Sequence, residues 1–395
     1  MKSLLTPIEG AVTAPHGFRA AAVAAGIKSN GKLDMALIVS DVPAVAAAVF
    51  TTNQVKAAPV KLSMKHIRHG QARAIVVNSG NANACTGPLG MIHAEAMAAA
   101  VARRIGCPTH QVLVCFTGRI GVPLPIVKVE AGIKKLLGTL SHTGGPAAAR
   151  GIMTTDTFPK EIAVSLKTTP NTIRIGAIAK GAGMIHPQMA TMLCFITTDA
   201  SLPRSALQRA LRTAVNQSFN RISVDGDTST NDTVICLANG LAGNVALPAF
   251  QEALNHVCRE LAKMIVRDGE GVSKFITVNV RGALNNRDAE LAARSVANSV
   301  LVKCSWCGGD PNWGRIMDAL GYSKAKVNEA LVDIAYDGVL AVRNGVATDV
   351  SRERLKKIVS APAFTVDIHL HLGRGRFTIH TCDLTERYVT LNKGE

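Results

Sequence analysis

Short apolar runs alternate along the first half of the chain with longer stretches in which apolar residues recur every three or four positions. Three of the short runs are followed by Gly, Pro, Asn or Thr, as expected of buried strands: 34–40, 74–78 and 111–115. Between them, residues 91–105 are rich in alanine and end in two arginines before Gly106, which predicts a helix. This alternation predicts layers of helices and strands.

The second half contains two stronger helical patterns and one pair of strand-like runs. Apolar residues spaced by three or four positions predict helices over 203–215 and 250–265, each with one face against a core. Residues 364–372 then alternate between apolar and polar, and a glycine-rich turn leads into 377–380. This pattern predicts a hairpin with one face toward water.

Composition indicates a large globular protein. With 395 residues, 47% of them hydrophobic, the chain can bury one large layered core or two lobes. Aromatic residues make up only 4%, so the core is built mainly from Ala, Val, Ile and Leu. We find neither the apolar stretch of a signal peptide nor the roughly 20 apolar residues of a membrane span, and we therefore expect a cytoplasmic protein with no membrane partner.

The basic residues, which give a net charge of +16, are scattered along the chain. The densest patch, residues 61–69, has no interleaved aromatic side chains and no known docking motif, which argues against a nucleic-acid partner. Neither a phosphate-binding glycine loop nor a dinucleotide fingerprint is present, so nucleotide binding is not supported. The basic surface either attracts small carboxylate substrates or is simply solvated.

Cysteine and histidine residues offer candidate metal or redox sites, and the pattern favours neither. Nine cysteines are scattered through apolar contexts, as expected of free thiols in a reducing compartment. Cys304 and Cys307 have redox or zinc spacing, but no second pair completes a site. His369, His371 and His380 occupy polar positions of alternating strands, which usually face water. We therefore expect no metal site.

Residues 180–193, KGAGMIHPQMATML, join a glycine-containing loop to an apolar strand-like run. A threonine hydroxyl is a poor nucleophile, but a threonine that begins a chain can use its own α-amine, with a pKa of about 7.7–8.0, as the base. A cut between Ala190 and Thr191 would create that arrangement. The simpler interpretation, which this feature alone favours, is that Thr191 begins a strand.

Two further segments could take part in chemistry. Thr117 and Gly118 follow a strand-like run and offer a hydroxyl and a backbone N–H that could stabilise an oxyanion, although ordinary turn chemistry explains them equally well. Residues 225–232, DGDTSTND, lack the glycine and the closing glutamate of a calcium loop. They are either a polar turn at the rim of an active site or a set of caps for a helix through 233–237.

Nine ordered segments together resemble the ornithine acetyltransferase family, the bifunctional glutamate N-acetyltransferases of arginine biosynthesis. They run from about residue 10 to the end of the chain: VTAPHGFRAAAVAAGIK (12–28), VNSGNANACTG (77–87), Thr117-Gly118, MTTDTFPK (153–160), KGAGMIHPQMATML (180–193), SFNRISVDGDTSTNDT (218–233), VRDGEGVSKF (266–275), GDPNWGRI (309–316) and CDLTERYVTLN (382–392). So many segments in order are more specific than any single motif, and they favour the cleavage interpretation of Thr191.

The resemblance implies a mixed α+β fold: an αββα sandwich like that of self-processing aminopeptidases, with a smaller C-terminal α/β lobe. It also implies self-cleavage between Ala190 and Thr191, which gives an α chain of residues 1–190 and a β chain of residues 191–395. The two chains would remain intertwined in one unit. Members of the family usually assemble as α2β2.

The resemblance also implies the reaction. Thr191 would take the acetyl group of N2-acetylornithine, release ornithine, and pass the acetyl group to L-glutamate to form N-acetylglutamate. Thr117 and Gly118 would form the oxyanion hole. Substrate would be bound by Thr154 or Thr155, Lys180, Thr191, Glu270 and Asn392. No cofactor is expected, although bifunctional members also use acetyl-CoA as a co-substrate.

Two alternatives stay open at this point. An amidohydrolase or aminopeptidase of the same architecture would pass the acyl group to water, and a binding protein that has lost self-processing would keep one intact chain. The chain also departs from the family pattern beside the oxyanion pair, where Phe116 and Arg119 replace the more common Ser and Val, and before the nucleophile, where Gln188 replaces Asn.

Overall fold

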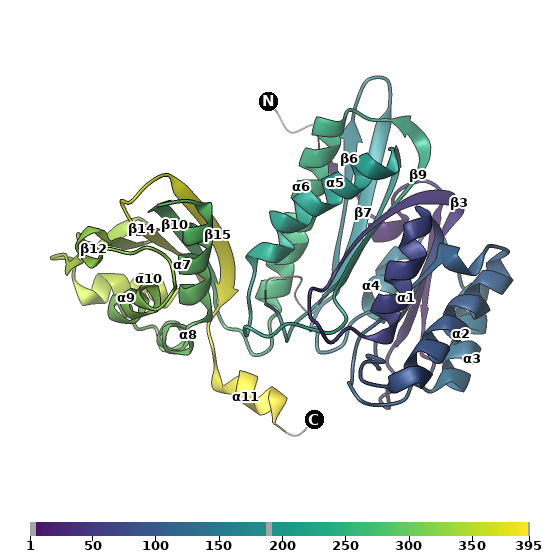
Figure 1. The fold of residues 1–395 in the computed structure, drawn as a ribbon, viewed down its shortest axis with the longest axis horizontal. Coiled ribbons are helices and arrows are strands. Elements are labelled where there is room, and N and C mark those ends of the chain that lie inside the picture. Colours follow the sequence, from purple (N-terminus) through teal and green to yellow (C-terminus); the bar gives the residue numbers. More distant parts are fainter. Residues whose placement is uncertain (1–4, 187–191, 394–395) are drawn as a thin grey trace. The chain divides into compact units, whose positions relative to one another are not determined.

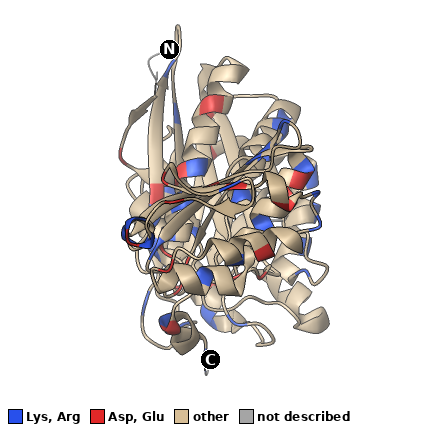
Figure 2. Cartoon of the chain, turned by 90° about the vertical axis from the view of Figure 1, so that its left-hand side faces the viewer, with Lys and Arg blue, Asp and Glu red and all other residues tan. Residues whose placement is uncertain are grey.

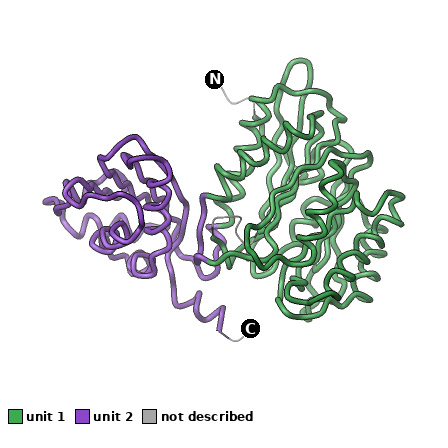
Figure 3. Tube along the Cα trace, in the orientation of Figure 1, with its two compact units in different colours: residues 1–220, 227–265 green, residues 221–226, 266–395 purple. Residues whose placement is uncertain are grey.

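The computed structural model describes residues 5–186 and 192–393, and the chain divides into two compact units (Figure 3). Met1–Asn220 and Asp227–Ile265 form the larger unit, whereas Arg221–Gly226 and Val266–Glu395 form the smaller one. Each unit has its own sheet, and the fold is of the mixed α+β class with a smaller C-terminal lobe, as expected.

Nine strands of the larger unit form one sheet, in the order β1-β6-β7-β8-β9-β3-β4-β5, with β2 paired to β3 (Figure 1). The strands are β1 (Leu5–Pro7), β2 (Phe18–Val23), β3 (Met35–Phe50), β4 (Gln71–Asn78), β5 (Val112–Phe116), β6 (Lys160–Lys167), β7 (Thr172–Lys180), β8 (Leu193–Ser201) and β9 (Thr233–Asn244). The three apolar runs that predicted strands in the first half lie in β3, β4 and β5, which confirms those predictions.

The long strand β3 joins two portions of this sheet. Its first part pairs with β2 on one side and β4 on the other, whereas its last part pairs with β9. Side chains of both portions share one core, in which Ile38 and Ile75 belong to the first portion and Phe195 and Ile235 to the second. All four are fully buried. The two portions therefore pack face to face and form the inner double layer of the expected sandwich.

Helices cover the outer faces of both portions. Alternate residues of the first portion, such as Leu37 and Val76, pack against Met97 of α2 and Ile133 of α3. The outer face of the second portion meets α6, whose Cys258 interacts electrostatically with the buried thiols of β8 and β9. The helices of the larger unit are α1 (Ala58–His66), α2 (Gly87–Ile105), α3 (Ile126–Gly138), α4 (Gly145–Gly151), α5 (Arg204–Asn216) and α6 (Leu247–Arg267). The helices predicted over 91–105, 203–215 and 250–265 correspond to α2, α5 and α6.

The smaller unit contains a six-stranded sheet in the order β13-β12-β11-β14-β10-β15. Its strands are β10 (Phe275–Ala283), β11 (Asp333–Tyr336), β12 (Val339–Arg343), β13 (Val346–Ala347), β14 (Ala363–His369) and β15 (Gly375–Cys382). Its helices are α7 (Asn286–Asn298), α8 (Val300–Cys307), α9 (Trp313–Gly321), α10 (Arg352–Val359) and α11 (Glu386–Asn392). A core centred on Trp306, Tyr336 and Phe364 holds sheet and helices together.

The hairpin predicted over 364–380 is wrong in its pairing, although both strands exist. β10 lies between β14 and β15, parallel to the first and antiparallel to the second. The connection crosses the end of β10, where the N–H groups of Leu370 and Leu372 donate to the carbonyls of Arg281 and Gly282. With β10 between them, both β14 and β15 form many backbone hydrogen bonds with that strand. Ile276 of β10 is buried among the apolar residues of β14 and β15. The expected alternation of buried and more exposed residues along both strands is confirmed.

Basic residues are scattered over many elements and interspersed with acidic ones, as Figure 2 shows for one view of the chain. This agrees with the scattered charge expected from the sequence. Within residues 5–186 and 192–393, no helix is long and apolar enough to cross a bilayer.

Candidate active site

The Thr117-Gly118 turn lies directly after β5 in the larger unit. Thr117 is buried, and its N–H donates to the carbonyl of Asn78 at the end of the neighbouring strand β4. Gly118 has a φ of +133°, and a Cβ there would lie 2.4 Å from the carbonyl carbon of Gly80 and 2.6 Å from the nitrogen of Asn81. Only glycine fits this close approach, so the backbone of the turn is held in one conformation.

Asn231, which lies just before strand β9, holds the same turn through its side chain. Its side-chain amide donates to the carbonyl of Phe116 at 2.9 Å and to that of Ala82 at 2.7 Å. Asn231 belongs to the 225–232 segment, which the sequence assigned either to an active-site rim or to helix caps. The cap interpretation is wrong, because Thr233 begins strand β9 and no helix follows. Asn231 instead buttresses the backbone that leads into Thr117.

Lys180, the last residue of β7, connects three of the predicted site residues. Its Nζ donates to Thr154 Oγ1 at 2.6 Å and to Thr117 Oγ1 at 3.4 Å, and the side chain is almost completely buried. An ammonium group can only donate, so both hydroxyl oxygens act as acceptors toward it. The hydrogen of each hydroxyl is therefore left to donate to another group. Thr155, by contrast, is exposed, and the structure brings Thr154 to Lys180.

Asp156 lies beside Lys180 and binds the backbone that follows it. One carboxylate oxygen accepts hydrogen bonds from Lys160 at 2.6 Å and from the Gly181 N–H at 2.8 Å, and the other accepts from the Thr154 N–H at 2.9 Å and lies 3.9 Å from Lys180. Burial alone would raise the pKa of this carboxyl, but Lys180, Lys160 and the hydrogen bonds outweigh it and hold the pKa well below its usual range. Asp156 is therefore a carboxylate.

Two lysines of this cluster share one carboxylate. Asp156, Lys160 and Lys180 are all buried and together carry one net positive charge, and the Lys28 ammonium interacts with both Lys180 and Asp156. A lysine ammonium in such a place can form a charge-assisted hydrogen bond with an incoming carboxylate. The cluster is therefore suited to a substrate carboxylate.

Asp232 accepts a hydrogen bond from the backbone immediately after the predicted nucleophile. Ala190 and Thr191 themselves lie outside the described residues. The N–H of Met192 donates to Asp232 Oδ1 at 3.0 Å, and the Thr233 N–H donates to the Met192 carbonyl. Burial raises the pKa of the Asp232 carboxyl well above its usual range, although the Met192 N–H and Lys180 oppose this. Asp232 ends the 225–232 segment, which the sequence offered as a possible active-site rim without singling out this acid.

Glu270 and Asn392, the remaining predicted site residues, belong to the smaller unit and contact each other. The Asn392 amide at the end of α11 donates to Glu270 Oε2 at 2.9 Å. The Thr385 hydroxyl, at the start of α11, donates to the carbonyl of Gly271 at 2.6 Å. Both ends of this short helix are thus tied to the turn that carries Glu270.

The histidines considered as metal ligands contact neighbouring side chains, and the two cysteines considered as a redox pair are free. His371 Nε2 lies 2.8 Å from Asp333 Oδ2 and its ring lies over His369, whereas His380 stacks on Phe275. Cys304 and Cys307 are free thiols on α8. Within the described residues, no group of three His, Cys, Asp or Glu side chains is arranged to hold a metal ion.

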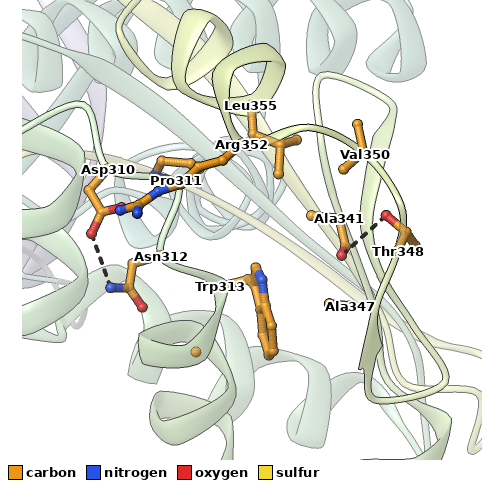
Figure 4. Close-up of a pocket in the computed structure, with 11 residues that line it drawn as sticks. Asp310, Pro311, Asn312, Trp313, Ala341, Ala347, Thr348, Val350, Arg352 and Leu355 are labelled. Carbon is orange, nitrogen blue, oxygen red and sulfur yellow. Dashed lines mark hydrogen bonds and ion pairs between the residues drawn. The ribbon is translucent and has the colours of Figure 1, made fainter.

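The smaller unit also has a cavity of about 340 Å³ (Figure 4). It is lined by Trp313 and by Asp310, whose carboxylate accepts hydrogen bonds from Asn312 and Arg352, both at 3.0 Å. Burial would raise the pKa of Asp310, but these two partners lower it. Part of the 309–316 segment lines this cavity, but none of the predicted site residues does.

Comparison with known proteins gives a consistent result along the chain. The model of the ArgJ family matches residues 19–394. The arginine biosynthesis bifunctional protein ArgJ of Geobacter sulfurreducens is 50% identical over 384 residues, covering 95% of this chain and 98% of its own length. The protein of the same name from Symbiobacterium thermophilum is 48% identical over 394 residues and covers 98% of both chains.

Solved structures include two similar proteins. The arginine biosynthesis bifunctional protein from Bacillus halodurans is 40% identical, with a TM-score of 0.48, and the match covers 50% of this chain and 97% of that chain. Ornithine acetyltransferase from Mycobacterium tuberculosis, solved as a complex with ornithine, is 44% identical, with a TM-score of 0.43 and coverage of 46% and 98%.

Proposed function

This chain belongs to the ArgJ family, and from this premise we propose that it transfers an acetyl group from N2-acetylornithine to L-glutamate through an acetyl ester on Thr191. It is an acetyltransferase of arginine biosynthesis. The observation that carries the proposed mechanism is the buried Lys180, which contacts the hydroxyls of both Thr117 and Thr154.

The first half-reaction breaks an amide bond. Thr191 Oγ attacks the acetyl carbonyl carbon while its proton passes to the Thr191 α-amine, which then protonates the departing ornithine nitrogen. The negative charge that develops on the carbonyl oxygen needs hydrogen-bond donors. The Thr117 hydroxyl, whose oxygen accepts from Lys180, and the rigid Gly118 backbone are suited to this role.

The second half-reaction reverses the first with a new amine. The α-amine of glutamate attacks the threonine ester, Thr191 recovers its proton, and N-acetylglutamate leaves. Donor and acceptor both carry an α-carboxylate, which the Lys180 ammonium would attract. Thr154, which accepts from Lys180, would donate its own hydrogen to substrate. By resemblance to the family, we assign Glu270 and Asn392 to substrate binding as well, with the Glu270 carboxylate suited to an ammonium group.

Formation of Thr191 as a chain start requires cleavage after Ala190, giving chains of residues 1–190 and 191–395. The strands before and after residues 181–192 support this proposal. β7 and β8 are neighbours in the sheet, with Lys180 opposite Leu193. A break between these strands would leave both in the same sheet, so it would nick one unit and would not separate domains. Assembly as α2β2 is proposed from the family resemblance alone.

We also propose a reducing compartment, the cytoplasm, as the site of action. All nine cysteines lie in the described residues and all are free thiols, five of them buried. Unpaired thiols in such number are typical of proteins kept in reducing surroundings.

Three experiments test the proposal. N-terminal sequencing of the purified protein should find a second chain beginning Thr-Met-Leu-Cys, and Thr191→Ala should remain whole and inactive. Incubation with acetylornithine and glutamate should yield N-acetylglutamate, and acetyl-CoA should also serve as donor if the chain is bifunctional like its relatives. Free acetate in place of acetylglutamate would indicate a hydrolase, and full activity of an uncut chain would refute the Thr191 mechanism.

A further inference from the structure

Lys28 follows β2 in the larger unit, and its ammonium joins three separate segments. Its Nζ donates to the carbonyl of Leu33 at 2.9 Å, to Ser79 Oγ at 2.9 Å and to the carbonyl of Met153 at 2.6 Å. An ammonium has three hydrogens, and these three acceptors use all of them. All three hydrogens of the Lys28 ammonium therefore bind protein atoms, and none is left for a substrate.

Asp34 fixes the loop that carries Lys28. Its buried carboxylate accepts hydrogen bonds from the N–H groups of Ala25 at 2.7 Å, Ile27 at 2.6 Å and Lys28 at 3.0 Å. The carbonyl of Asp34 also accepts from the Ser79 N–H at 2.8 Å. The loop and the end of β4 are thus held together before the Lys28 ammonium makes any contact.

Lys28 and Ser79 each donate one hydrogen bond to a carbonyl at or just after the end of helix α4. The Ser79 hydroxyl donates to the carbonyl of Gly151, the last residue of that helix, at 2.7 Å. Lys28 donates to the carbonyl of Met153, two residues later. The next residue is Thr154, which contacts Lys180. The segment that carries Thr154 is therefore clamped to the end of β4 just before it reaches the proposed site.

We infer that Lys28 is a positioning residue, which holds the Gly151–Met153 segment so that Thr154 meets Lys180 and the substrate. This inference rests on the proposed function, because it assigns to Lys28 the placement of a proposed substrate contact. It predicts that the effect of removing Lys28 passes through Thr154.

The ionisation of Lys28 gives an additional readout. Burial lowers the pKa of the Lys28 ammonium to about 8, with Lys180 on β7 and Lys32 on the same loop acting in the same direction. Asp34 on its own loop and Asp156 beyond α4 oppose this shift. The clamp should therefore lose its charge as pH rises through about 8.

The first test replaces Lys28 by Met, with Lys32→Met as the matched control. Lys32 lies on the same loop and is exposed. We expect Lys28→Met to weaken ornithine binding, measured by calorimetry, and to raise the KM for acetylornithine by about 10- to 100-fold, the usual effect of losing a hydrogen bond to a charged group. Lys32→Met should match the wild type. Unchanged ornithine binding and KM in Lys28→Met would overturn the inference.

A double-mutant cycle with Thr154→Val tests the route of the effect. If Lys28 acts through Thr154, the double variant should be no worse than Thr154→Val alone. If the two losses multiply, Lys28 does not act through Thr154 and the inference fails. Calorimetric ornithine binding separates this outcome from failure of the proposed function, since it requires no acetyl transfer.

Lys28→Arg tests the role of charge in a variant that keeps a cation. We expect kcat/KM of the wild type to fall as Lys28 loses its proton above about pH 8. Arginine stays protonated throughout the usable pH range, so in Lys28→Arg this fall should move to higher pH. A fall that stays at the same pH in Lys28→Arg would contradict the assignment.

Discussion

Lys180 Nζ and Thr154 Oγ1 lie 2.6 Å apart, so the end of one strand and a loop 26 residues earlier meet through a partly buried hydrogen bond. This contact defines the proposed site because the same ammonium also donates to Thr117. A single positive charge thereby orients two hydroxyl groups, one assigned to substrate binding and one to oxyanion stabilisation.

Lys180→Met should impair both roles. Loss of the charge removes the proposed partner of the substrate carboxylate, and loss of the donor frees the Thr117 hydroxyl to rotate. We expect kcat/KM for acetylornithine to fall by about 10²-fold, as for the loss of a charged hydrogen-bond partner. Lys167→Met, at the exposed end of β6, is a matched control and should retain full activity. Equal kinetics in the two variants would remove Lys180 from the site.

Thr117→Ala should slow acetyl transfer and self-cleavage together. If its hydroxyl is a principal oxyanion donor, kcat should fall by about 10²–10³-fold, because this stabilisation acts in the transition state. The KM for acetylornithine should change little. Steady-state kinetics and the fraction of cut chain on a denaturing gel measure both effects. A normal kcat would place the oxyanion donor elsewhere.

Gly118→Ala should disturb the Thr117-Gly118 turn through a steric clash. A methyl group there would meet backbone atoms of Gly80 and Asn81 at 2.4 and 2.6 Å, and the φ of +133° is unfavourable for any L side chain. We expect self-cleavage to stop and the midpoint of thermal unfolding to fall. Gly121→Ala, also at positive φ but with open space around its Cβ, is the control for backbone strain alone. A fully cut Gly118→Ala protein would show that the turn tolerates the shift.

Asp156→Asn should destabilise the larger unit by about 3–5 kcal/mol, because it removes the buried carboxylate that both Lys160 and Lys180 contact. The pKa of Asp156 is lower in the folded state than in the unfolded chain, where it is about 3.9. Its stabilisation is therefore complete above that value and is lost as pH falls toward the folded pKa. The difference in the free energy of unfolding between the wild type and Asp156→Asn should be constant near neutral pH and should shrink below about pH 4. Urea denaturation at several pH values measures it, and a difference that does not shrink between pH 4 and pH 2 would contradict this account.

Local pattern was a reliable guide to individual elements. Alanine-rich and apolar spacing located α2, α5 and α6, and the apolar runs of the first half located β3, β4 and β5. These elements can be predicted because their apolar periodicity is a property of neighbouring residues in the chain.

Pairing between distant segments could not be predicted in this way. The alternating runs at 364–372 and 377–380 are close in sequence, yet β10, about 100 residues earlier in the chain, separates them in the sheet. A local turn signal contains no information about a third strand that can pair with both. The same limit applies to the turn after β5, because its support by Asn231 comes from a segment 115 residues away.

The sequence by itself determined the family, the type of reaction and the candidate residues, because family motifs keep residue types in a fixed order. Only the tertiary structure decided that Thr154 contacts Lys180 while Thr155 is exposed, and that Lys28 and Asp156 hold this contact in place. Hydrogen bonds and buried charges act over about 3 to 4 Å, and that distance is set by how strands and loops remote in sequence pack together.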